Sequence, residues 1–211
     1  MHMDYRRPLL LVTPTLDGDV LAALARAEIE LTGRELARHV GHGSPEGVRR
    51  AADRLVSQGT LLRRTAGAAH LYRLNRDHLA APWIEGLAGL REQLIERLRA
   101  LLAGWEQPAR VALLFGSVAR GKASADSDLD LLIVRERECD PDSDGWRSQI
   151  LNLEQSATAW TSNDARVLEY GAHELDDTAD ERLLTEALRD GIELSGSRRT
   201  LRRLMRPEVR A

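Results

Sequence analysis

Two short apolar runs flank a glycine–serine turn and lead to two closely spaced aspartates, and this arrangement limits the possible folds more than any other feature. Residues 111–115 are apolar and β-prone, which predicts a buried strand. Residues 129–134 predict a second strand. Because side chains alternate along a strand, we expect Asp128 and Asp130 on the same face. The chain should therefore form a sheet that presents two adjacent carboxylates.

The segment between the two predicted strands carries residues that suit phosphate. Gly116 permits backbone torsions and a close ligand approach that a Cβ would block, and Ser117 offers a hydroxyl and an amide. Arg120 adds a planar, permanently charged fork for the β- or γ-phosphate. Lys122 lies in the same segment and joins the expected nucleotide-binding residues. For Lys122 the alternative is an exposed loop lysine. Adjacent carboxylates repel each other without a cation, so the pattern predicts Mg²⁺ or Mn²⁺ together with a nucleoside triphosphate.

This segment resembles the signature of the DNA polymerase β-like nucleotidyltransferase superfamily, particularly its minimal members. The resemblance is carried by Gly116-Ser117-x-x-Arg120-Gly121 followed by Ser127-Asp128-x-Asp130, and it covers roughly residues 108–196. It implies a small mixed α/β domain that binds a nucleoside triphosphate with a divalent metal and transfers a nucleoside monophosphate to a hydroxyl. The same resemblance implies that Gly121 and Ser127 complete the nucleotide-binding set. In two-metal chemistry of this kind the ions stabilise both the entering and the leaving oxygens.

The resemblance also implies a third metal-binding carboxylate on the next strand. The candidate strand is residues 165–170, which follows a predicted helix over residues 146–160. Glu169 is the first candidate, and Asp164 at the entrance of the strand is the second. The alternative for Glu169 is a solvent-facing or ion-paired glutamate. With Glu169 included, the expected catalytic and metal-binding set is Asp128, Asp130 and Glu169.

Composition and charge indicate two domains of different character. The 211 residues can bury a sizeable core. Residues 1–80 carry a net charge of about +3, whereas residues 81–211 carry about −6. No apolar run approaches the ~20 residues that span a bilayer, and the single Cys139 cannot form an internal disulfide. We therefore expect a cytoplasmic protein without membrane contact, and the preference for Arg over Lys suggests a GC-rich bacterial genome.

The first half is expected to hold three helices and a hairpin. Helices are predicted at residues 16–27, from the capping box Thr32/Glu35 to Gly41, and from the N-cap Ser44 to Gln58. A hairpin is predicted from residues 61–65 and 69–74. This order resembles the winged helix-turn-helix domain of bacterial transcription regulators, and the resemblance implies contacts to double-stranded DNA. The implied DNA-binding residues are Ser44, Glu46, Arg49, Arg50, Arg54, Arg63, Arg64 and Arg73. The alternative is a module that binds a partner protein or oligomerises, with the arginines as a solvated face.

The expected architecture is thus α+β, with four consecutive segments. They are a winged helix-turn-helix domain at 1–80, a connecting helix at 81–107, a nucleotidyltransferase domain with a small mixed sheet at 108–198, and a fraying basic tail at 199–211. An apolar stripe between residues 84 and 105 predicts one helix of about six turns that connects the domains. It would either pair with its copy in a homodimer or pack only on the sheet of its own chain. A helix over residues 181–189 and a strand over residues 191–196 are expected to close the second domain.

The leading functional hypothesis combines both halves. It is a DNA-binding transcriptional regulator whose second domain binds a metal-bound nucleoside triphosphate and transfers a nucleoside monophosphate to a hydroxyl acceptor. One alternative is a catalytically inactive nucleotide sensor that uses the same pocket. Another is the nucleotidyltransferase component of a toxin–antitoxin module, which would act on a partner toxin or on tRNA.

Overall fold

The computed structural model describes residues 2–175 and 181–205 and divides the chain into two compact units. One unit is Arg7–Leu90, and the other joins the segment up to Arg6 to the chain from Arg91 onward. The expected N-terminal domain began at residue 1, whereas the N-terminal unit of the structure begins at Arg7. The Met3 amide donates to the Asn163 side chain at 3.1 Å, and Tyr5 is buried. These first residues therefore belong to the second unit.

Helices and a small antiparallel sheet make up the N-terminal unit. Its elements are η1 Pro8–Leu11, α1 Leu16–Arg26, β1 Leu31–Thr32, α2 Gly33–Val40, α3 Pro45–Ser57, β2 Leu61–Ala66, β3 Ala69–Leu74 and α4 Ala81–Ala88. The strand order is β1-β3-β2. The predicted capping box forms, since the Thr32 and Glu35 side chains each accept from the other's backbone amide. Ser44 caps α3 as predicted, and β2 and β3 form the predicted hairpin. The short strand β1 was not expected.

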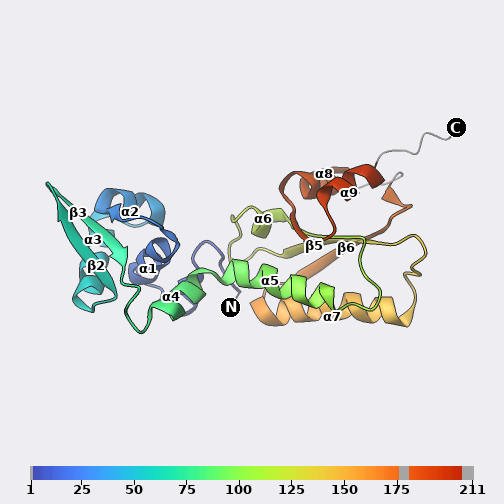
Figure 1. Ribbon diagram of the computed structural model, residues 1–211, viewed down its shortest axis with the longest axis horizontal. Helices are drawn as coiled ribbons and strands as arrows, with labels where there is room; N and C mark the ends of the chain where they lie inside the picture. Colours follow the sequence, from blue (N-terminus) through green and yellow to red (C-terminus); the bar gives the residue numbers. More distant parts are fainter. Residues whose placement is uncertain (1, 176–180, 206–211) are drawn as a thin grey trace. The chain divides into compact units, whose positions relative to one another are not determined.

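The C-terminal unit is built around a mixed sheet. Its elements are α5 Leu90–Ala103, β4 Val111–Phe115, α6 Gly116–Ala119, β5 Leu129–Arg135, α7 Asp144–Thr161, β6 Ala165–Gly171, α8 Glu181–Asp190, β7 Ile192–Ser195 and α9 Arg198–Leu204. The strand order is β6-β5-β4-β7, with β5 and β6 parallel and the other pairs antiparallel. Helices α5 and α7 cover one face of the sheet, and α8 and α9 cover the other (Figure 1). The expected α+β architecture with a small mixed sheet is confirmed.

The prediction of one long connecting helix is wrong. Helix α4 ends at Ala88 and α5 begins at Leu90, with Gly89 between them. The Gly89 amide bonds to the Glu85 carbonyl and closes the last turn of α4. Glycine is a poor helix former because ordering its backbone is entropically costly, so a break at this position is unsurprising. The apolar stripe is therefore shared by two helices.

The prediction of a fraying tail from residue 199 is also wrong for the first part of that segment. Residues Arg198–Leu204 form α9, and Ser197 caps it by accepting from the Thr200 amide. Leu201 is completely buried against residues of α8 and the sheet. One deeply buried leucine thus anchors a segment that is otherwise rich in arginine. Residues 206–211 lie outside the described part of the chain.

Candidate nucleotide and metal site

The two aspartates lie at the start of β5, on the face of the sheet that α8 covers. Asp130 is paired with Phe115 on β4 and with Arg166 on β6, and Asp128 lies just before the strand. Burial raises the pKa of Asp130 above its ordinary value, and the neighbouring charge of Asp128 raises it further. A half-buried pair of carboxylates is therefore electrostatically unfavourable without a cation. Arg166 and Arg120 offset this effect only in part.

The backbone of Gly116 lies directly against the Asp130 carboxylate, and we call the space that holds this carboxylate the Asp130 cradle. The φ of Gly116 is +73°, in the left-handed region that favours glycine. A Cβ at this position would overlap the Asp130 carboxylate. The sequence alone suggested that a ligand approaches this glycine closely. The structure shows that the group approaching it within the protein is the expected metal-binding carboxylate itself.

The expected phosphate-binding residues follow Gly116 along α6 and the next loop. Ser117 lies in the single turn of α6 and is half-buried, whereas Arg120, Gly121 and Lys122 are exposed. The Ser127 hydroxyl accepts from the Ser124 amide at 3.0 Å and so shapes the loop that leads to Asp128. These residues are local neighbours of the aspartates, as the expected site requires.

Arg120 is held by two carboxylates that were not among the expected site residues. Its Nη1 lies 3.7 Å from Glu186 Oε2 and 3.6 Å from Asp190 Oδ2, both on α8. Glu186 also raises the pKa of Asp130, although it contributes less than burial and Asp128 do. No local motif marks these two residues, because only the packing of α8 on the sheet brings them to Arg120.

Glu169 does not join the aspartates, which corrects the expected three-carboxylate set. In the parallel register Glu169 pairs with Ile133, whereas Arg166 pairs with Asp130. Since side chains alternate along both strands, Glu169 lies on the opposite face from Asp130. There Glu169 Oε1 accepts from Trp146 Nε1 at 2.8 Å and from Arg135 Nη1 at 3.1 Å. The alternative of an ion-paired glutamate describes this residue.

The residue that β6 does bring to the aspartates is Arg166. Its Nη1 lies 2.9 Å from Asp128 Oδ2, and its Nε donates to Asp164 Oδ2 at 3.2 Å. The second candidate, Asp164, is thus exposed and bound to the same guanidinium. The sequence alone places Arg166 and Glu169 on opposite faces of this strand, because side chains alternate along it. Only the pairing of β5 with β6 shows which of the two faces Asp130.

The donor set at this site fits a divalent cation that arrives with a nucleotide. Within residues 2–175 and 181–205, no group of three or more His, Cys, Asp or Glu side chains is arranged to hold a metal ion. Mg²⁺ typically uses one or two carboxylates and completes its shell with phosphate oxygens and water. Asp128 and Asp130, in a cradle kept open by Gly116, match this mode of binding.

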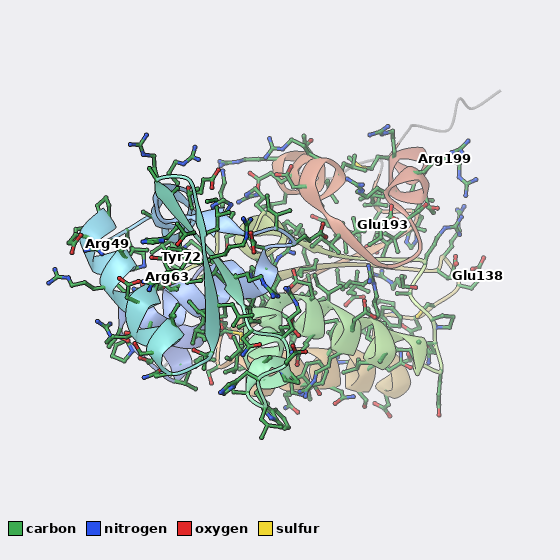
Figure 2. All side chains as sticks on the ribbon, turned by 60° about the vertical axis from the view of Figure 1, so that its left-hand side comes forward. Arg49, Arg63, Tyr72, Glu138, Glu193 and Arg199 are labelled. Atoms are coloured by element: carbon green, nitrogen blue, oxygen red, sulfur yellow. The ribbon has the colours of Figure 1, made fainter. Side chains whose placement is uncertain are left out.

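The residues expected to contact DNA lie on α3 and the β2–β3 hairpin of the N-terminal unit. Figure 2 shows Arg49, Arg63 and Tyr72, which come from these elements. All three contact Asp53: Arg49 Nη1 at 3.4 Å, Arg63 Nη1 at 3.0 Å and the Tyr72 hydroxyl at 3.1 Å. Asp53 therefore neutralises part of the charge on this surface.

The other expected DNA contacts are also engaged within the unit. Glu46 accepts from Arg49 at 2.7 Å and lies 3.9 Å from Arg50 Nε, and the Arg49 bond is the main reason why the pKa of Glu46 is lowered. Arg54 pairs with Asp17 at 2.7 Å. Arg64 and Arg73 both pair with Glu30, and the hydrogen bond from Arg64 is the main reason why the pKa of Glu30 is lowered.

The Ser44 hydroxyl accepts from the Gly47 amide and so caps α3. Every arginine of the expected set has a carboxylate partner in the same unit.

The mixed α+β architecture is consistent with a nucleotidyltransferase fold. Residues 97–199 match the family described as "Polymerase beta, Nucleotidyltransferase". These residues are therefore a polymerase beta-type nucleotidyltransferase domain. A search of curated proteins gives no match.

Solved structures similar to this chain include three toxin–antitoxin structures. A toxin–antitoxin crystallised with AMP-PNP has 18% sequence identity and a TM-score of 0.39, with 53% of this chain and 80% of that chain covered. A mutant of the toxin–antitoxin MntA-HpeT with two aspartate-to-glutamate substitutions has 15% identity, a TM-score of 0.39 and the same coverage. A tyrosine-to-alanine mutant of MntA-HpeT has 19% identity and a TM-score of 0.36, covering 54% and 79%. Among the described residues of this chain, no helix is both long and apolar enough to cross a membrane.

Proposed function

We propose that residues 97–199 bind a nucleoside triphosphate together with Mg²⁺ or Mn²⁺ and transfer its nucleoside monophosphate to a hydroxyl. The observation that carries this proposal is the Asp128–Asp130 pair beside Gly116, where a Cβ would exclude the Asp130 carboxylate. Burial, and then the neighbouring charge of Asp128, raise the pKa of Asp130, so the ionised pair destabilises the fold in the absence of a cation. Binding a cation at this position removes the repulsion.

Each residue of the site has a defined role in the proposal. Asp128 and Asp130 would hold the metal, which supplies charge neutralisation for the triphosphate and for the leaving pyrophosphate. Ser117 and the backbone of α6 donate to phosphate oxygens. Arg120 turns from Glu186 and Asp190 to the phosphates. The free energy of this change is small, because the distances from Arg120 to the two carboxylates, 3.7 and 3.6 Å, are long for ion pairs.

The proposed transfer exchanges one phosphorus–oxygen bond for another. The acceptor oxygen forms a bond to the α-phosphorus, and the bond from this phosphorus to the bridging oxygen breaks. Pyrophosphate leaves with the electron pair, and the hydroxyl proton passes to water. The chain contributes by orienting the triphosphate and by neutralising its charge, which is the main part of catalysis in phosphoryl transfer.

A label-transfer assay tests this function and identifies the acceptor. The purified protein is incubated with each labelled NTP and Mg²⁺ or Mn²⁺, alone and with total RNA or cell lysate. The control is the double variant Asp128→Ala/Asp130→Ala. Metal-dependent transfer that the control lacks supports the proposal, and the labelled species shows whether the acceptor is protein or RNA. Labelling of a partner protein or of tRNA would support the role in a toxin–antitoxin module. Full transfer by the double variant would contradict the assigned site.

A catalytically inactive nucleotide sensor is the second candidate, and the position of Glu169 favours it. Because Glu169 lies on the far face of the sheet, the site has two carboxylates where three were expected. A sensor would bind metal and nucleotide without turnover. Tight NTP binding with no label transfer under any condition would establish this function in place of the enzyme.

For the N-terminal unit we propose a winged helix-turn-helix domain that binds double-stranded DNA weakly. Support comes from α3, which exposes Arg49 and Arg50, and from the β2–β3 hairpin, which exposes Arg63 and Arg64. The carboxylate partners of these arginines limit the number of phosphates that the unit can neutralise. Fluorescence anisotropy with a random-sequence duplex at low salt tests this proposal. No binding at about 50 mM salt would instead favour a module that binds protein.

A further inference from the structure

Arg166 lies between two carboxylates at the edge of the proposed nucleotide site. Its backbone pairs with Asp130 across the parallel β5–β6 register, so its side chain starts on the face of the sheet that carries the aspartates. The guanidinium then bridges two carboxylates, with Nη1 at 2.9 Å from Asp128 Oδ2 and Nε at 3.2 Å from Asp164 Oδ2. A positive charge between two carboxylates is the arrangement that a divalent ion would otherwise create.

Among the described charged groups around the aspartates, Arg166 is the one that pairs with Asp128. Arg120, whose charge also acts on Asp130, lies against Glu186 and Asp190 on α8. In the part of the chain that the structure describes, Asp128 forms an ion pair with Arg166 alone. Within the same residues, Asp130 lies in no ion pair of its own, although the charges of Arg166 and Arg120 act on it from a distance. The site is thus divided into Asp128, which already has a cationic partner, and Asp130, which lacks a direct one.

We propose that the Arg166 guanidinium replaces a second divalent ion, so that the site binds one Mg²⁺ or Mn²⁺ with the nucleotide and not two. This proposal rests on the nucleotide site proposed above. A guanidinium keeps its charge at every physiological pH and offers donors in a fixed planar fork. It can neutralise Asp128 and Asp164, but it has no open coordination position for a hydroxyl or a water.

One consequence concerns the acceptor. A second metal would bind the acceptor hydroxyl and lower its pKa, and a guanidinium cannot do this. Nucleotide binding is therefore expected to be intact while transfer is slow. A second consequence concerns the first metal, since Arg166 competes weakly for Asp128. Its side chain is 65% exposed, and an exposed ion pair is weak, so the competition is expected to change metal affinity by no more than about fivefold.

The test counts bound metal ions directly. Mn²⁺ is titrated into the full chain in the presence of a non-hydrolysable α,β-methylene NTP, and bound ions are counted by electron paramagnetic resonance and by calorimetry. The wild-type chain is expected to bind one Mn²⁺. The variant Arg166→Asp adds a carboxylate in place of the guanidinium and is expected to bind two. The variant Arg166→Gln is expected to bind one, with an affinity up to about fivefold tighter than wild type.

Arg147→Asp is the matched control. Arg147 is an arginine of similar exposure, 66%, that pairs with Asp142 at 3.3 Å, and it lies on α7, on the other side of the sheet. This variant makes the same change of charge and is expected to keep one Mn²⁺. Two ions in the wild-type chain, or a single ion in Arg166→Asp that folds as wild type by circular dichroism, would overturn the proposal.

Failure of the nucleotide site itself has a different signature. If the wild-type chain and both Arg166 variants bind neither Mn²⁺ nor the nucleotide analogue, the proposed function is wrong and Arg166 loses its role with it. If nucleotide binds and label is transferred but the count of ions is two, the function stands and only the role of Arg166 is wrong.

Discussion

The backbone of Gly116 lies so close to Asp130 that a Cβ on residue 116 would overlap the aspartate's carboxylate. The end of β4 and the start of β5 therefore approach each other closely at the paired residues Phe115 and Asp130. The position of the Asp130 carboxylate depends on the missing side chain of Gly116. The positive φ of Gly116 adds a second, independent reason for glycine.

Gly116→Ala is accordingly expected to damage the site more than the fold. The positive φ costs roughly 1–2 kcal/mol for a residue with a Cβ, and the overlap forces Asp130 to move. We expect Mn²⁺-dependent nucleotide binding to weaken at least ~10-fold, measured by calorimetry, because the displaced carboxylate no longer faces the metal. Chemical denaturation should show a loss of about 1–2 kcal/mol or somewhat more.

Gly67→Ala separates backbone strain from the effect on the site. Gly67 has φ +59°, and a Cβ added to it would meet no heavy atom within 4 Å, so only the strain remains. This control should lose a similar free energy of unfolding and keep full nucleotide binding. Equal nucleotide binding by Gly116→Ala and Gly67→Ala would contradict the cradle around Asp130.

Asp130→Asn is expected to stabilise the metal-free protein and to abolish its response to metal. Burial, and then the charge of Asp128, raise the pKa of Asp130, so the ionised form is less favourable in the folded protein than in the unfolded chain. For an acid with a raised folded pKa, stability falls as pH rises from below the ordinary value through the raised one. The uncharged side chain of asparagine avoids this loss of stability at neutral pH.

Thermal unfolding at two pH values checks this prediction. At pH 7 without metal, Asp130→Asn should unfold at a higher temperature than wild type, and each ~1 kcal/mol corresponds to about 2–4 °C. Below pH about 3 the wild-type carboxyl is mostly protonated in both states, and the difference should disappear. Addition of Mn²⁺ and nucleotide should raise the unfolding temperature of wild type only. A lower unfolding temperature for Asp130→Asn at pH 7 would show that the charge of Asp130 does not destabilise the fold.

Glu169→Ala is expected to destabilise the protein and to leave nucleotide transfer within about twofold of wild type. The change leaves the buried Trp146 Nε1 and Arg135 Nη1 without the acceptor that Glu169 provides, and an unsatisfied buried donor costs about 1–3 kcal/mol. Glu169→Gln keeps an acceptor and should lose less. Urea denaturation and the label-transfer assay measure the two effects. A ~10-fold loss of transfer in Glu169→Gln with unchanged stability would show that Glu169 takes part in nucleotide transfer.

The contrast between Glu169 and Asp130 shows which features of the site could be predicted from the sequence. Strands β4 and β5, the glycine and the two aspartates are close together in the sequence, and local pattern suffices to place them. The face of β6 that meets Asp130 depends on the register between β5 and β6, which are joined through the long helix α7. A shift of one residue in that register would exchange Arg166 for its neighbours, and nothing local specifies it.

The same distinction applies to the helices. The capping residues Thr32 and Ser44 identify the starts of α2 and α3 because their hydrogen bonds are made within three residues. Helix α9 has a local cap of the same kind at Ser197, but its packing on the domain depends on Leu201, whose burial requires the packed surfaces of the sheet and α8. Among the expected DNA contacts, the exposure of the arginines was predictable, but their pairing with carboxylates from other elements was not.

Glu30→Gln is expected to strengthen binding to DNA. Glu30 pairs with Arg64 and Arg73 of the hairpin, and its loss frees both guanidinium groups for phosphates. Each additional phosphate that is neutralised steepens the dependence of log K on log salt by about 0.9. We therefore expect Glu30→Gln to bind a random-sequence duplex more tightly at low salt, with a slope steeper by about 1–2, measured by fluorescence anisotropy between about 50 and 200 mM salt.

Glu28→Gln is the matched control for this experiment, since Glu28 is an exposed glutamate of the same unit that forms no ion pair with the described residues. It changes the net charge by the same amount and should leave the salt slope unchanged, because it frees no arginine. If both variants gain affinity equally, net charge alone governs binding. If neither variant binds DNA, the proposal that the N-terminal unit binds DNA is wrong. The exposed arginines of the hairpin would then contact another partner.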